Sequence, residues 1–535
     1  MLTAKSTLDK SDSAAQQGHS HLTTPANRSH DGGSGLRHRG ALVPLIAIVS
    51  VGSIVLSACS SSKPKAASTS APAAASTATT AGAPSAAASG SAPAAASASA
   101  PAAASSGAAT GATYTGPPVT ITVAVTANPL MTTIEKLTPA GFQASHPNIK
   151  VKFVTYDENT ERANVEKDVA AGGGQYDVVM IGPNDIASWA KNGWIKDLTA
   201  DAASDPSYDV GDLLKPISDA LSSDGKLYAV PFYGESSFMM YNKKMFAAAG
   251  VTMPANPTWA QIATLADKLN DPSKGVAGIC LRGLTGWGDN LAALDTVVNT
   301  MGGQWFDTSW NAHLTDPAFE AAVNFYVNLI KKDGEKGAGN DSFNECLNIL
   351  EQGKAAMWYD ATVAAATVDA PGSPIQGNVG FAPAPVDKTA ASGWLWSWAL
   401  ALEGSSKNAQ AAWTFMDWAT SKSYIAYDAA QNGWAAVPPG TRTSTYQNPS
   451  YQAAAKDFAA LTLSQINSVN VNQPGVAPQP VPGVQYVGIP EFEDFGQKVS
   501  AEITAAIDGQ ESVSTALQKS QSIAQQAVIA AGYKK

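Results

Sequence analysis

The order of strands and helices expected between residues 119 and 182 restricts the fold of this chain more than any other feature of its sequence. Three expected strands alternate there with two expected helices. The first two strands alternate apolar and polar residues, and the third is a continuous apolar run typical of a strand covered on both faces. This order predicts an α/β fold with a parallel sheet wrapped by helices. The strands are VTITVAV (119–125), IKVKFVTYD (149–157) and YDVVMIG (176–182). The helices are 131–145, which Pro139 is expected to break or kink unless it opens a new helix, and 158–174, which ends in three glycines.

Small polar side chains follow these expected strands at their carboxyl ends. Ligands of parallel α/β sheets gather at this edge. Amides and carboxylates on loops are suited to hydrogen-bonding a neutral polar molecule. We therefore expect a binding site at this edge, with the candidates Asn128, Asp157, Glu158, Asn184 and Asp185.

The part of the chain expected to fold runs from about residue 118 to residue 535. These 418 residues are too many for one ordinary core, so two lobes are expected. They carry 27 Lys and Arg against 41 Asp and Glu, a net charge of −14 that argues against nucleic acid as a partner. Their only histidines are His146 and His313, so we expect neither a histidine-rich metal site nor a cofactor.

Residues 1–58 have the features of a secretory leader. The apolar run ALVPLIAIVSVGSIVL (41–56) follows Arg37 and Arg39, and it is shorter than the ~20 residues of a bilayer-spanning helix. LSAC (56–59) resembles a bacterial lipobox, which implies cleavage before Cys59 and attachment of a diacylglyceryl group to its thiol. The alternative is a chance LSAC after an ordinary signal.

Residues 59–117 consist almost wholly of Ala, Ser, Thr, Pro and Gly. A segment with so little apolar bulk cannot offset its chain entropy, so a disordered tether behind the lipidated cysteine is expected. More than one acyl chain holds a protein stably at a membrane. The predicted location is the cell surface, on the extracellular side of the cytoplasmic membrane.

Two cysteines remain after Cys59. An even number outside the cytosol favours a disulfide between Cys280 and Cys346. Two buried free thiols are the alternative.

Tryptophans occupy positions 394, 396 and 398 of GWLWSWALAL (393–402). On a strand all three indoles point to the same side, and each can bury roughly 150–250 Å². They must therefore cover either the core or a ligand. We expect Trp394 or Trp396 to face a ligand and Trp398 to pack internally; the alternative is that all three belong to the core.

Several longer stretches follow one another in an order that points to one family. They are GGGQYDVVMIGPNDIASWAKNGWIKDLT (172–199), LYAVPFYGESSFMMYNKKMFAAAG (227–250), TWAQIATLADKL (258–269), FNECLNILEQGKAAMWYDATV (343–363), SSKNAQAAWTFMDWATS (405–421) and AAIDGQESVSTALQKSQ (505–521). Together they resemble the extracellular solute-binding proteins of bacterial ABC sugar importers, over nearly all of 118–535. PFYGESS (231–237), GICLRGLTGWGDN (278–290), GWLWSWALAL and GWAAVPPGTRTSTYQNP (433–449) resemble in particular the branch that binds sugar alcohols such as mannitol and sorbitol.

The resemblance implies a two-lobed, type II periplasmic-binding-protein fold with the ligand cleft between the lobes. The first lobe would comprise about 118–234 and 400–437, and the second about 235–399 and 438–535. AVPFYGESSFMMYN (229–242) and GWLWSWALAL would cross between the lobes. A ligand that contacts both lobes selects their closed form, which the transmembrane permease subunits of an importer could distinguish. The resemblance implies a monomer.

Recognition of a sugar alcohol by such a cleft needs carboxylates, amides and arginines, because each hydroxyl both donates and accepts hydrogen bonds. Three alternatives remain open: Asp289 caps a helix, Arg442 pairs with a surface acid, or Arg282 belongs to an interior ion pair. The candidates are Glu235, Asp289, Asn290 and Asp360 as acceptors or amides, Arg282 and Arg442 as donors, and Trp287 beside Asp289.

The predicted function is that of a lipid-anchored, non-enzymatic subunit that captures a sugar alcohol and delivers it to a permease. The same role for a mono- or disaccharide, with Trp287 and Trp394 stacked on a pyranose ring, is the alternative. A secreted glycoside hydrolase would need two carboxylates about 5–9.5 Å apart, and no local motif suggests such a pair. A purely structural or adhesive lipoprotein would not explain tryptophans and acids at lobe crossings.

Overall fold

The computed structural model describes residues 111–535. The expected leader, Cys59 and the tether up to residue 110 lie outside the described residues. Residues 111–117, which their composition assigns to the tether, already contact the folded part: the backbone N–H of Ala112 donates to Oδ2 of Asp417 at 3.0 Å. Within 111–535, none of the helices combines the length and the apolar character that crossing a bilayer requires.

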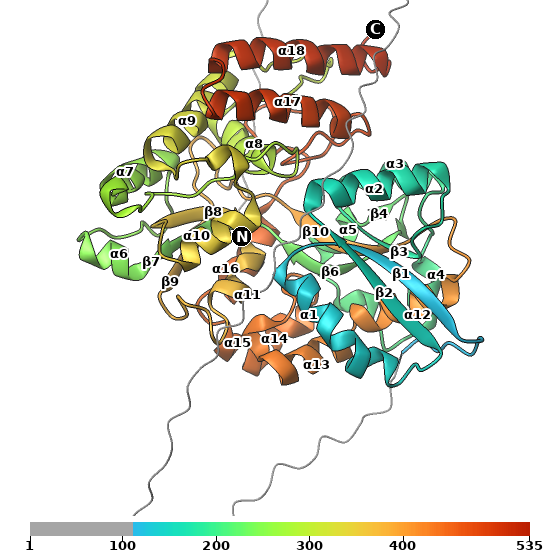
Figure 1. Cartoon of the computed structure of the whole chain (residues 1–535). Coiled ribbons are helices and arrows are strands. Elements are labelled where there is room, and N and C mark those ends of the chain that lie inside the picture. Colours follow the sequence, from blue (N-terminus) through green and yellow to red (C-terminus); the bar gives the residue numbers. More distant parts are fainter. Residues whose placement is uncertain (1–110) are drawn as a thin grey trace, which may run out of the picture. The chain divides into compact units, whose positions relative to one another are not determined.

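The sheet of the first lobe has five strands in the order β2-β1-β3-β10-β6 (Figure 1). β1 pairs in parallel with β2 and with β3, which confirms the parallel sheet predicted from the alternation of strands and helices. β10 is antiparallel to both β3 and β6. The strands are β1 (Val119–Thr126), β2 (Ile149–Tyr156), β3 (Val178–Ile181), β6 (Ala229–Glu235) and β10 (Trp396–Leu402); β4 (Ser222–Ser223) and β5 (Lys226–Leu227) form a separate pair.

Helices that connect these strands begin and end where the sequence provides caps. Asn128 and Asp157 are the N-caps of α1 and α2, each accepting a backbone N–H three residues further on. α2 ends at Gly172, whose φ of 60° is left-handed. Because proline lacks an N–H, α1 ends before Pro139, and a π-helical turn follows. The helices of this lobe are α1 (Pro129–Thr138), α2 (Glu158–Ala171), α3 (Pro183–Asn192), α4 (Thr199–Ser204), α5 (Lys215–Ala220), α12 (Ala409–Ala419) and α13 (Lys422–Asn432).

The second lobe is built on an antiparallel sheet in the order β8-β7-β9, from β7 (Ser237–Asn242), β8 (Met357–Ala361) and β9 (Val379–Pro383). At the top of Figure 1, α17 and α18 lie side by side and pack on α8 and α9. The remaining helices of the described residues are α6 (Lys243–Ala248), α7 (Trp259–Leu269), α8 (Asn290–Met301), α9 (Pro317–Asp333), α10 (Phe343–Glu351), α11 (Ala365–Val368), α14 (Thr443–Gln447), α15 (Pro449–Ala454), α16 (Ala459–Ser468), α17 (Phe492–Ile507) and α18 (Val513–Ala530).

The chain passes between the two sheets at Ser236, which separates β6 from β7, and returns just before β10. In the first sheet, Trp396 lies opposite Glu235. A register shift between Trp398 and Ala399 leaves Phe232 of β6 without an opposite residue, next to Pro231, which lies opposite Ala399. Glu235 therefore lies at the crossing, as the sequence predicts.

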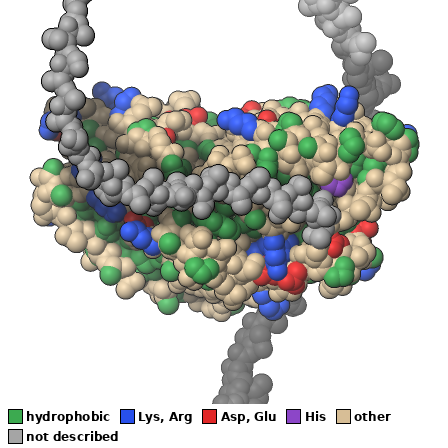
Figure 2. Space-filling view, turned by 90° about the horizontal axis from the view of Figure 1, so that it is seen from below, with side chains coloured by type: hydrophobic (Ala, Val, Ile, Leu, Met, Phe, Trp, Pro, Cys, Tyr) green, Lys and Arg blue, Asp and Glu red, His purple; other side chains and the backbone are tan. Residues whose placement is uncertain are grey.

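One face of the molecule carries charges of both signs. On the coloured part of the face in Figure 2, acidic and basic side chains are interspersed among neutral ones.

The interior is mainly apolar, and all three tryptophans of GWLWSWALAL are buried within it.

Candidate functional site

A pocket lies between the two lobes, and both sheets contribute to its wall. The first lobe supplies the ends of β1 and β6 and the start of α2, and the second supplies Arg282, Asp289 and the start of α10. Its polar lining residues are Thr126, Asn128, Asp157, Glu158, Asn159, Tyr233, Glu235, Arg282, Asp289, Ser342, Asn344, Glu345 and Thr367.

Asn128 and Asp157 lie at the carboxyl ends of β1 and β2, where the parallel sheet predicts them. Oδ1 of Asn128 accepts from the N–H of Met131 at 3.0 Å, and its Nδ2 donates to the hydroxyl of Tyr233 at 3.1 Å. Asp157 accepts from the N–H of Thr160 at 3.0 Å. Both side chains are thus fixed by helix capping while they line the pocket.

Glu235 is a buried carboxyl at the end of β6, with 5% of its surface exposed. Burial, with a smaller contribution from the nearby carboxyls of Asp360 and Glu158, raises its pKa to about 8, although the charge of Arg282 partly compensates. The group is therefore mainly a neutral acid at pH 7, able to donate as well as accept a hydrogen bond.

Arg282 and Asp360 form a buried ion pair. The guanidinium donates to both carboxylate oxygens, Nε to Oδ2 at 2.8 Å and a terminal nitrogen to Oδ1 at 2.6 Å. Asp360 also accepts from the indole of Trp358 at 3.0 Å and is fully buried. Asp360 is not among the residues that line the pocket; it holds Arg282, which is. The interior ion pair left open by the sequence is therefore present, with one member facing the pocket.

Asp289 links the two lobes. Its Oδ1 accepts from the hydroxyl of Ser342 at 2.6 Å, and its Oδ2 accepts from Nδ2 of Asn159 at 2.8 Å. It occupies the N-cap position of α8, but its side chain makes no capping hydrogen bond. Burial raises its pKa to about 6, and the charge of Glu158 adds to this.

Asn159 and Asn344 make further hydrogen bonds between the lobes. Nδ2 of Asn159 also donates to the carbonyl of Thr285 at 3.1 Å, and Nδ2 of Asn344 donates to the carbonyl of Ala127 at 3.1 Å. These two amide side chains, both of which line the pocket, therefore connect the two lobes directly.

Trp394, Trp396 and Trp398 all line a small cavity next to the pocket. Two of them contact Arg162, whose guanidinium carbon lies 4.6 Å from the ring centre of Trp398 and 5.1 Å from that of Trp396. Trp287 of the second lobe covers the same guanidinium at 4.1 Å. Three indoles therefore surround an arginine whose side chain is only 10% exposed, whereas the ring centre of Trp394 lies 5.9 Å from the guanidinium carbon of Arg282.

Only Trp398 of the three tryptophans reaches the larger pocket, the reverse of the arrangement expected from the sequence. Trp394 packs against Tyr359, with ring centres 6.0 Å apart, and Trp396 lies between Trp398 and Trp287. Trp287 lines the small cavity and is not among the residues of the larger pocket. Which indole faces the pocket therefore depends on contacts with residues that are distant in the sequence.

Three other candidate residues lie away from the pocket lining. Asn290 is buried and joins α8 to α17, donating to the carbonyl of Ser500 at 3.1 Å and accepting from its hydroxyl at 2.7 Å. Asn184 donates to Asp185 and to Glu493 at 2.8 and 2.7 Å. Arg442 is fully buried; it donates to the carbonyls of Tyr208 and Thr420 and also forms an ion pair with Asp212 at 3.5 Å, so the pairing with an acid left open by the sequence is present, but below the surface.

Sequence reasoning misses several lining residues. Tyr233 lies in the expected crossing segment 229–242 and Asn159 in the expected helix 158–174, so their position near the strand ends was a usable signal. Ser342, Asn344 and Glu345 belong to the start of α10, where Ser342 and Glu345 form a capping box. That motif predicts a helix start and carries no indication of a pocket.

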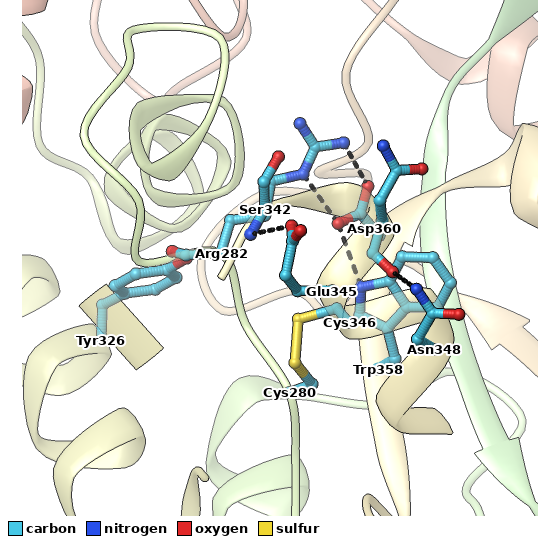
Figure 3. Close-up of a disulfide and its surroundings, with 10 residues drawn as sticks. Cys280, Arg282, Tyr326, Ser342, Glu345, Cys346, Asn348, Trp358 and Asp360 are labelled. Atoms are coloured by element: carbon cyan, nitrogen blue, oxygen red, sulfur yellow. Dashed lines mark hydrogen bonds and ion pairs between the residues drawn. A yellow bond between two sulfur atoms is a disulfide. The ribbon is translucent and has the colours of Figure 1, made fainter. Parts of the chain in front are cut away.

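A disulfide connects this helix to the loop segment that carries Arg282 (Figure 3). Cys280 and Cys346 are bonded, with their Cα atoms 5.6 Å apart. Among residues 111–535, the one group of side chains with metal-compatible spacing consists of these two cysteines and Glu335. Because both sulfurs are used in the disulfide, this group does not indicate a metal site.

Three comparisons with known proteins agree with this architecture. The mannitol-binding protein of Pseudomonas aeruginosa is 41% identical over 418 residues, which are 78% of this chain and 94% of that protein. The structure of an ABC transporter solute-binding protein from Agrobacterium vitis S4 with bound D-mannitol has 47% identity and a TM-score of 0.76, covering 78% of this chain and 100% of that one. A solute-binding protein from Agrobacterium radiobacter K84 in complex with ribitol shares the fold, with 24% identity, a TM-score of 0.68, and coverage of 77% and 100%.

The likeness extends to the family as a whole. The family model described as bacterial extracellular solute-binding protein matches residues 124–426. The neighbours confirm the predicted two-lobed α/β fold. This chain belongs to the bacterial extracellular solute-binding proteins.

Proposed function

We propose that this protein is the substrate-binding subunit of an ABC importer and that its ligand is an acyclic sugar alcohol of the mannitol type. The observation that carries the proposal is the pocket between the lobes, in which carboxyl and amide groups from both sides face one space. The mannitol-binding relative and the mannitol-bound neighbour, both above 40% identity, support the choice of ligand.

The lining offers partners for hydroxyls in several directions. Asp157 and Asp289 are acceptors, Asn128 and Asn344 are amides, and Arg282 is a charged donor. Hydrogen bonds with a charged partner contribute about 1.5–3 kcal/mol each. A ligand lacking one hydroxyl leaves such a group unpaired, which gives selectivity for chain length and configuration.

Capture and delivery follow from the position of the pocket between the lobes. A ligand that binds Asp157 on one lobe and Arg282 on the other stabilises the arrangement in which Asn159 bridges them. The permease subunits would receive this closed form. No bond in the ligand is made or broken in this mechanism.

The ring-sugar alternative is less well supported by the geometry. It relied on Trp287 and Trp394 to stack on a pyranose ring. Trp287 covers Arg162 instead, and neither indole is among the residues lining the larger pocket.

The anchoring part of the proposal rests on LSAC and the segment behind it. Cys59 would carry the lipid, and the segment up to about residue 110 would be the tether. In cells, wild-type protein is expected in the membrane fraction and a Cys59→Ser variant in the medium or periplasm. A variant that remains fully membrane-bound would contradict lipid anchoring at this cysteine.

Calorimetric titration of the purified protein tests the ligand class. The panel is mannitol, sorbitol, arabitol, xylitol, glucose, maltose and trehalose. We expect saturable one-to-one binding confined to the acyclic alcohols. Binding of ring sugars alone would overturn the polyol assignment while leaving the importer role, and no binding across the panel would overturn the ligand class altogether.

A further inference from the structure

The pocket contains more negative than positive groups. Its lining includes the carboxyls of Asp157, Glu158, Glu235, Asp289 and Glu345 and a single cationic side chain, Arg282. The charge of Arg282 is already matched by Asp360, which lies outside the lining. The pocket therefore has no free cationic group of its own among the described residues to balance its acids.

Four of the five acids have a stabilising partner. Glu158 pairs with Arg162 at 2.9 Å, and Asp289 accepts from Ser342 and Asn159. Asp157 accepts a backbone N–H at the N-terminus of α2, and Glu345 accepts the N–H of Ser342 at 3.1 Å at the start of α10. Each of these four side chains therefore already has a hydrogen-bond donor or a cation within reach.

Glu235 differs from these four, because the neutral indole of Trp394 lowers its pKa less than burial raises it. Among the described residues it has no ion-pair partner within 4 Å and caps no helix, although only 5% of its surface is exposed. The charged groups facing it are Arg282, already paired, and the carboxyls of Asp360 on β8 and Glu158 on α2; the phenol of Tyr233 lies two residues earlier on the same strand. Arg162 lines the adjoining cavity with it. This environment keeps Glu235 protonated near pH 7, with a pKa of about 8.

We propose that the pocket also binds amino alditols, sugar alcohols in which an ammonium replaces one terminal hydroxyl, with the ammonium against the carboxylate of Glu235. The inference rests on the proposed function, because the rest of the chain would occupy the polyol site. Glu235 must ionise to form the ion pair, so its carboxyl proton passes to solvent as the ammonium binds. Aliphatic ammonium groups keep their own proton in this pH range.

Calorimetry of the full protein with 1-amino-1-deoxy-D-mannitol, D-mannitol and D-mannonate tests this directly. D-Mannitol has two equivalent ends, so one amino derivative samples both orientations in the pocket. At pH 7, titrations in buffers of different ionisation enthalpy should show release of about 0.9 proton for the amine, from a carboxyl of pKa about 8, and none for mannitol. The affinity for the amine should rise up to about tenfold per pH unit from pH 6 to 8. Mannonate should bind at least about 100-fold more weakly than mannitol, because its carboxylate meets the acids of the pocket.

The variant Glu235→Gln keeps the size of the side chain and removes its ionisation. It should abolish the proton release and lower the ratio of amine to mannitol affinity by at least about tenfold, the loss of one buried ion pair. Glu345→Gln is the matched control: it removes another lining acid, and the proton release should remain.

The two proposals fail separately. Mannitol binding together with an amine that binds tenfold more weakly, or without proton release, would overturn the inference alone. Proton release that persists in Glu235→Gln would also overturn it. Failure of every ligand to bind would overturn the proposed function, and the inference with it.

Discussion

Removal of the Asp360 carboxylate should destabilise this protein more than loss of any exposed acid. In Asp360→Ala the guanidinium of Arg282, with 6% of its side chain exposed, loses both bonds of a bidentate ion pair. Breaking a buried pair in this way costs about 3–5 kcal/mol, because one charge is left without a partner. The N–H groups of Trp358 and Ala361 lose their acceptor as well. We therefore expect the free energy of unfolding, measured by urea denaturation at pH 7, to fall by at least about 3 kcal/mol.

Two further variants separate charge from packing. Asp219→Ala removes the acid of an exposed pair with Lys215 at 2.8 Å, and such pairs contribute less than about 1 kcal/mol. The double variant Arg282→Met/Asp360→Leu should recover most of the lost stability but not mannitol binding, because its apolar pair fills the space without the donor. If Asp360→Ala is no more destabilising than Asp219→Ala, the Asp360 carboxylate does not stabilise the fold by compensating the buried charge of Arg282, and the reasoning is refuted.

Three other outcomes follow from the site. Asn159→Ala removes two hydrogen bonds between the lobes, at about 0.5–1.5 kcal/mol each, so titration should show mannitol affinity about tenfold lower with unfolding little changed; equal affinity would contradict the bridging role. Replacing Cys280 and Cys346 by alanine opens a loop spanning 66 residues, which should lower the free energy of unfolding by about 4 kcal/mol. Denaturant titrations of the variant and of the wild type, each with and without reductant, measure this difference. The pKa of Glu235 in the folded protein is about 8, above its ordinary value of 4.5. Between these two pH values the folded protein keeps the carboxyl proton and the unfolded chain loses it, so the stability that Glu235 contributes at low pH is lost as the pH rises. Relative to wild type, Glu235→Gln should therefore gain on the order of 3 kcal/mol between pH 5 and 9, and a pH-independent difference would exclude this titration.

The fold could be predicted because its signals are local. Apolar alternation defined β1 and β2, and the parallel pairing of these strands placed Asn128 and Asp157 at the pocket edge. The position of each of these two residues could be predicted from the strand before it and the helix after it alone. Glu235 was predicted from its position at a crossing, which the resemblance supplied.

The errors in the candidate site have a common cause. Asp360, Asn290 and Arg442 are buried polar residues that satisfy other buried groups, and in a sequence they look the same as polar residues that wait for a ligand. The surroundings of Trp398 include a register shift and Arg162, more than 200 residues away in the chain, and Trp394 packs against Tyr359 of the other sheet. Such contacts exist only once the chain has folded.

The indoles around Arg162 also allow the relative movement of the two lobes to be followed by tryptophan fluorescence. Trp287 comes from one lobe, whereas Trp396 and Trp398 come from the other, and the ring centres of Trp287 and Trp396 are 5.9 Å apart. Separation of the lobes would remove Trp287 from the cation and admit water to all three rings. Indole emission responds to both changes, so the fluorescence spectrum would follow opening and closure without any added label.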